Sequence, residues 1–72
     1  MADDVRLTAR ECELLRHLAA GNNLRQCARL MVVEPCTANT HAANIRQKVG
    51  ARTLPQLAIW AVHHRPLWER TE

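Results

Sequence analysis

Signals for starting and stopping a helix alternate at short intervals along this chain, and they constrain its fold more than any other feature. In the first, Thr8 and Glu11 have the spacing of a capping box, in which each side chain satisfies a free backbone amide of the other residue. The start signals are Thr8, Asn23, Pro35 and Thr53, and the stop signals are Gly21, Gly50 and Pro66. These intervals predict four short helices, with the first over 9–20 and the third over 35–49.

Apolar residues recur at helical spacing between these signals. Leu14, Leu15 and Leu18 form one stripe in the first segment. The stripe of the third segment is Ala38, Ala42, Ile45 and Val49. The chain has 72 residues, is 47% apolar and lacks Phe and Tyr, so a β-sandwich or barrel is not favoured. We therefore expect one all-α domain over residues 1–72, with its core over about 7–65.

The junction between the second and third helices is short. Leu24, Cys27, Ala28 and Met31 predict the buried face of the second helix, and Pro35 then starts the third after only three residues. Two helices joined by so tight a turn form a helix-turn-helix.

Positive charge is concentrated in the middle of the chain. The formal net charge is +3, and residues 21–65 carry six Lys or Arg side chains against Glu34 alone. This distribution fits a polyanionic partner. Ordinary solvated helix faces would give a similar pattern, and the sequence leaves both interpretations open.

Cysteine and histidine do not indicate a metal site, a cofactor or an enzyme. Three cysteines in a chain without a secretion signal argue against a disulfide framework and for a reduced, cytoplasmic protein without a membrane segment. Cys27, Cys36 and His41 lack the close pairs of structural zinc sites. Cys36 and His41 differ by about 140° around a helix, too far for a nucleophile and its base.

The joint register of several motifs resembles the LuxR/FixJ/GerE type of DNA-binding domain. The matching residues are Leu7 to Glu11, Gly21, Ala28, Thr37 to His41, Asn44, Ile45 and Lys48 to Gly50. The resemblance implies a four-helix LuxR-type helix-turn-helix domain of a bacterial transcription factor, whose third helix enters the major groove and whose fourth helix often forms a dimer. It also implies a half-buried packing role for His41. The early Met1 suggests the stand-alone, GerE-like form, with a truncated chain as the alternative.

The outward face of the third helix is predicted to read bases. With residues 38, 42, 45 and 49 buried, the residues that point away are Cys36, Asn39, Thr40, Ala43 and Gln47. Asn39 can pair with adenine, and Thr40 can contact a thymine methyl group. The family usually has basic residues at Cys36 and Asn39, so this face is unusually short of charge.

A second set of residues is predicted to contact the DNA backbone. These residues are Arg25, Thr37, Arg46, Lys48, Arg52 and Thr53. Thr37 could instead cap the third helix, and Arg46 and Lys48 could be plain solvated charge. Glu34 stands where the family usually has Ser, and a carboxylate facing phosphate would weaken binding.

The fourth helix is predicted to form a weak homodimer. The residues of this helix that are expected to face away from the core form a second stripe of Gln56, Trp60, His63 and Leu67. A large aromatic residue on an outward face favours an interface. The alternative is that Leu67 and Trp68 fold back over the first helix.

Two functions follow from these observations. The first is a sequence-specific DNA-binding transcriptional regulator that acts at the bacterial nucleoid. The second is a protein-binding modulator on the same fold, an anti-activator or a phage-type protein, with a transcription factor or RNA polymerase as its partner. The uncharged reading face favours the second function, whereas the backbone set favours the first.

Overall fold

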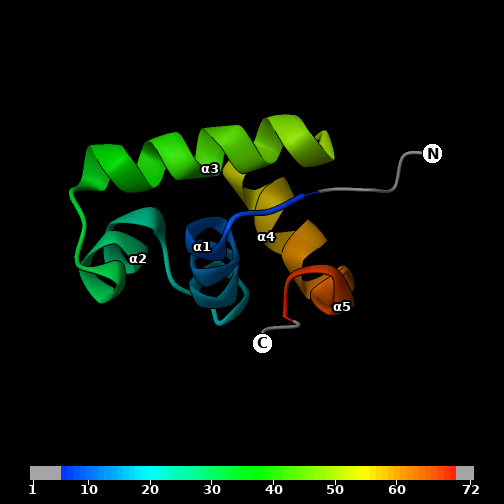
Figure 1. The fold of residues 1–72 in the computed structure, drawn as a ribbon, viewed down its shortest axis with the longest axis horizontal. Helices are drawn as coiled ribbons and strands as arrows, with labels where there is room; N and C mark the ends of the chain where they lie inside the picture. The colour runs from blue at the N-terminus through cyan, green and yellow to red at the C-terminus, as the bar shows by residue number, and fades with distance from the viewer. Residues whose placement is uncertain (1–5, 70–72) are drawn as a thin grey trace.

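The computed structural model describes residues 6–69, which are all helical apart from their turns (Figure 1). The helices are α1 (Ala9–Ala19), α2 (Leu24–Met31), α3 (Pro35–Val49), α4 (Leu54–His63) and α5 (Arg65–Trp68). The four predicted helices are confirmed, with ends within about one residue of those expected. α1 lies at the centre and packs against α2, α3 and α4, while α3 runs across them (Figure 1).

The caps at the starts of the helices are built largely as the sequence indicates. In α1 the Thr8 hydroxyl accepts from the Glu11 amide at 3.1 Å, and Glu11 accepts from the Thr8 amide at 2.9 Å. Asn23 and Gln26 make the same reciprocal pair at the start of α2. α4 differs, because the carboxamide of Gln56 accepts from Arg52 rather than closing a box.

The turn between α2 and α3 contains an unusual backbone conformation. Val32 ends α2 with φ 59° and ψ 50°, in the left-handed region. Gly21 and Gly50 also have positive φ values, and both follow helices there. Val32 takes a position that glycine usually fills. Its left-handed conformation ends α2 abruptly, so that α3 can start at Pro35, three residues later.

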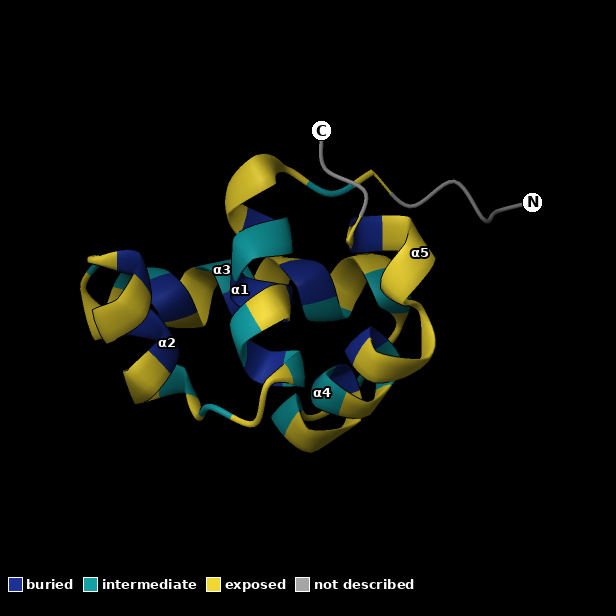
Figure 2. Ribbon diagram, turned by 90° about the horizontal axis from the view of Figure 1, so that it is seen from below, coloured by how far each residue is buried: buried dark blue, intermediate teal, exposed yellow. Residues whose placement is uncertain are grey.

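The core lies where the inner faces of all the helices meet (Figure 2). Leu14, Leu15, Ile45 and Leu57 are fully buried within it. Cys27 is also fully buried, which confirms its prediction as a small core residue.

The C-terminal turn closes this core. α5 was not predicted, and it brings Trp68 to 1% exposure with its indole N–H donating to the Ala61 carbonyl at 2.8 Å. Trp68 therefore folds back into the core, as the fold-back alternative expected, but its hydrogen bond is to α4 and not to the first helix. Leu67, next to it, stays exposed.

Candidate nucleic-acid interface

The outer face of α3 is open to solvent along its length. All five predicted base-reading residues are exposed, whereas Ala38, Ala42 and Ile45 are buried beneath them. The exposed set is Cys36, Asn39, Thr40, Ala43 and Gln47. Asn44 is exposed as well and was not predicted, although its register places it beside Thr40 and Gln47. The face presents amides, a hydroxyl and a thiol, but no charge.

Thr40 is partly committed to its own helix. Its hydroxyl donates to the Cys36 carbonyl at 3.0 Å, a bond that Thr commonly makes within helices. The hydroxyl oxygen can still accept, and the methyl group stays free. Asn39, Asn44 and Gln47 are therefore the amide side chains that this face offers to a ligand.

The predicted backbone set flanks this face but is not uniformly free. Arg25, Arg52 and Thr53 are exposed, and Thr37 is half-buried. The Thr53 hydroxyl accepts from the Gln56 amide at 3.2 Å and so caps α4. The guanidinium of Arg46 donates to the Arg52 carbonyl at 3.0 Å and ties α3 to the loop before α4.

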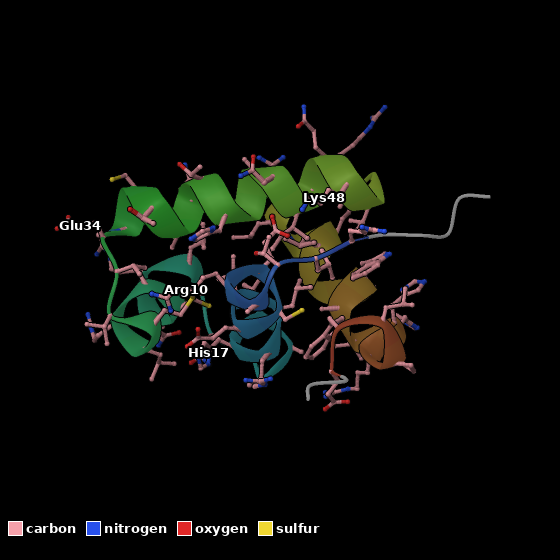
Figure 3. All side chains as sticks on the ribbon, viewed as in Figure 1. Arg10, His17, Glu34 and Lys48 are labelled. Carbon is pink, nitrogen blue, oxygen red and sulfur yellow. The ribbon has the colours of Figure 1, made fainter. Side chains whose placement is uncertain are left out.

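Lys48 has a structural partner that the sequence did not indicate. Its ammonium lies 2.7 Å from the carboxylate of Glu11, which is only 3% exposed, and it also donates to the Arg6 carbonyl. Figure 3 shows Lys48 on the side of α3 that faces the segment leading into α1. This ammonium therefore links α1 to α3, and its positive charge is already balanced.

Glu34 stands at the start of α3, at the edge of the outer face (Figure 3). It is exposed, its side chain makes no cap hydrogen bond, and it forms no ion pair within residues 6–69. The other three carboxylates in this part of the chain all pair with Lys or Arg. Glu34 is thus the one described carboxylate whose charge stays free beside the reading face.

The residues predicted for a dimer do not share one open apolar stripe. Trp60 is half-buried, packs against the core and stacks on His64 with ring centroids 4.6 Å apart, so it lies less far outward than the sequence predicted. Gln56, His63 and Leu67 are exposed. The apolar residues that α4 leaves open are Ile59 at 58% and Val62 at 47% exposure. The spacing of three residues between Ile59 and Val62 places them on one side of the helix, and this spacing is the sequence signal that indicates an exposed apolar stripe.

Two of the three thiols, and His41, lie in environments that suit packing. Burial raises the pKa of the thiols of Cys12 and Cys27, which keeps both protonated near neutral pH. Cys36 is exposed on the outer face of α3, and His41 is half-buried as expected. Among residues 6–69 there is no group of three His, Cys, Asp or Glu side chains placed to hold a metal ion. No helix in that range has the length and hydropathy needed to cross a membrane.

Comparison with known proteins agrees with this geometry. Residues 5–61 match the family described as bacterial regulatory proteins, luxR family. The chain belongs to the luxR family. This membership confirms the resemblance inferred from the sequence, and the helical architecture confirms the predicted fold. The family is one of transcription regulators and not of enzymes.

Two curated relatives illustrate the match. The chain is 37% identical over 59 residues to the transcriptional activator protein PhzR of Pseudomonas fluorescens, covering 82% of the chain and 24% of that protein. It is 33% identical over 58 residues to the transcriptional regulatory protein MctR of Rhizobium johnstonii, covering 81% of the chain and 27% of that protein. The chain thus spans about a quarter of the length of these relatives. No solved structure matches it significantly.

Proposed function

We propose that this luxR-family domain binds duplex DNA as a sequence-specific transcriptional regulator in the bacterial cytoplasm, with α3 in the major groove. The observation that carries the proposal is the exposed polar face of α3. A helix with buried residues on one side and long amides on the other can enter the groove and pair with base edges. Asn39 reads adenine, Thr40 contacts a thymine methyl group, and Gln47 reaches base or phosphate. The small side chains of Cys36 and Ala43 allow close approach.

Backbone contacts supply most of the affinity. Arg25, Arg52, Thr37 and Thr53 lie next to α3 or at helix starts, where cations, hydroxyls and free amides meet phosphate. Arg46 retains donors beyond the one that it gives to Arg52. Lys48 contributes mainly by holding α3 in place, because its ammonium already has two acceptors.

Fluorescence anisotropy with random and genomic duplexes over a range of salt concentrations tests this proposal. Asn39→Ala should relax the preference at one base pair by about 1–3 kcal/mol. Arg46→Ala should weaken binding to all sequences alike and reduce the slope of log K against log salt by about one unit. If the parent bound no duplex even at low salt, DNA binding would be excluded.

A parent that bound no duplex would favour a second function, a protein-binding modulator on this fold. The free carboxylate of Glu34 and the uncharged reading face are the observations that support it. Its partner would be a transcription factor or RNA polymerase. Retained DNA affinity with normal salt dependence would argue against this alternative.

On DNA we propose that the domain forms a weak homodimer through α4. The proposed interface is recentred on Ile59 and Val62, with Gln56 and His63 at its edge and Leu67 at its C-terminal end. An apolar groove of about 250 Å³ adjoins this stripe, with Pro55 and Ala58 among its lining residues. A second copy that places Ile59 or Val62 near this groove would cover apolar surface on both chains. A two-fold dimer would bind an inverted repeat.

A further inference from the structure

A groove between α2 and the start of α3 carries two arginine side chains. It has a volume of about 340 Å³. Its lining residues are Arg25, Ala28, Arg29, Val33 and Pro35. Arg25 and Arg29 are one helical turn apart, so both project from the same side of α2.

No carboxylate within residues 6–69 neutralises the charges of these arginines. Arg25 and Arg29 are exposed, and neither pairs with a carboxylate within residues 6–69. The other side chains that line the groove are apolar, so they offer no acceptor to a guanidinium group. Two cations that converge on a groove with apolar walls favour an anionic ligand.

The position of the groove indicates which anion it accepts. Its lining reaches Pro35, the first residue of α3, and the next residue, Cys36, begins the outer face of that helix. A duplex that contacts Cys36 and Asn39 therefore brings a phosphate of its backbone alongside the groove. Guanidinium groups suit phosphate because they donate two parallel hydrogen bonds to its oxygens.

We infer that Arg25 and Arg29 together clasp one phosphate of the DNA backbone in this groove. This inference rests on the proposed function and adds Arg29 to the backbone set. The clasp places two positive charges near the start of α3, where Glu34 contributes a negative one. These two charges attract the DNA backbone near the start of α3, where the reading face itself carries no positive charge.

Salt dependence can count the phosphates that the two arginines neutralise. The test uses Arg25→Gln, Arg29→Gln and the double variant, each with a short random-sequence duplex in an anisotropy titration. Each single variant should weaken binding about tenfold at low salt, as expected for the loss of a charge-assisted hydrogen bond. The double variant should reduce the salt slope by only about 0.9 per bound protomer, because one phosphate is released.

Arg16→Gln is the matched control. Arg16 is exposed on the side of α1 opposite its buried leucines, so its removal should leave the slope unchanged. The clasp is contradicted if Arg29→Gln behaves like Arg16→Gln. It is also contradicted if the double variant loses about 1.8 units of slope, since each arginine would then hold its own phosphate. In both cases the parent still binds DNA, whereas a parent without affinity would contradict the proposed function itself.

Discussion

Val32 adopts a backbone conformation that β-branched residues rarely adopt. With φ 59° and ψ 50° it lies in the left-handed region, where its branched Cβ crowds the neighbouring carbonyl group. Its side chain is 87% exposed, so packing does not offset this strain. The conformation is imposed by the tight turn that α2 and α3 require. The cost for one such residue is about 1–3 kcal/mol.

Val32→Gly should therefore stabilise the domain. Glycine removes the strain, although its greater freedom in the unfolded chain offsets up to about 1 kcal/mol of the gain. We expect a net gain of about 1 kcal/mol, or a midpoint of thermal unfolding raised by about 4–8 °C. Thermal unfolding followed by circular dichroism measures this.

The control for this change is Val62→Gly. Val62 is exposed within α4 and has an ordinary helical environment, so glycine there should lower the midpoint. If both variants lowered the midpoint, the strain assigned to Val32 would be absent.

At the scale of the elements, one ion pair adds a polar link to the apolar packing between α1 and α3. Glu11 closes the capping box of α1 and also accepts from Lys48 near the end of α3. The carboxylate is almost fully buried, while the side chain of Lys48 is 37% exposed. The pair thus helps to hold the end of α3 against the start of α1.

Lys48→Met should destabilise the domain by about 2 kcal/mol, because it leaves the buried Glu11 carboxylate with only the Thr8 amide. Adding Glu11→Gln should recover part of this loss, since no unpaired charge is then buried. A double-mutant cycle by urea unfolding measures the coupling. Additive effects of the two changes would show that the pair contributes nothing to stability.

The reading face of α3 should gain affinity for DNA when it gains charge. Ala43→Lys adds a cation to this face, and Glu34→Ser removes its free carboxylate. Each should raise binding to random duplex, and each should change stability by less than about 0.5 kcal/mol because both sites are exposed. Anisotropy at low salt measures the affinity. If neither variant bound better than the parent, these positions would not face DNA.

The helices were predictable because their start signals are local. Capping residues and the apolar stripe of α3 lie within a few residues of the features that they determine. α5 has no start signal beyond Pro66, and the burial of Trp68 with its hydrogen bond to Ala61 is a tertiary contact that no local pattern indicates. The outward position of the exposed residues of α3 could be predicted from the buried stripe in the same way.

The role of Lys48 could not be predicted from local pattern. Its partner Glu11 lies 37 residues away, and such a contact depends on how the helices cross. The position of Trp60, by contrast, depends on local helix geometry. The preference of tryptophan for interfaces favours Trp60 as an outward residue, whereas helix geometry places Ile59 and Val62 further from the core.

At the scale of the whole molecule, self-association is predicted to depend on the open stripe of α4. Ile59→Glu and Val62→Glu should each abolish dimerisation without unfolding the domain, because both side chains are exposed. Sedimentation velocity at matched concentrations, with and without duplex, measures this. The control is Arg16→Glu, an exposed change on α1. A parent that stayed monomeric on DNA would exclude the α4 interface.

Trp68 has a further consequence for the order in which the molecule can fold during synthesis. A ribosome releases the amino end first, so the leucines of α1 emerge well before the indole that shares their core. The nascent chain therefore passes through a stage in which helices can form while the core stays open at one side. We expect this domain to reach its protease-resistant state only after the ribosome has released Trp68, rather than helix by helix as it emerges.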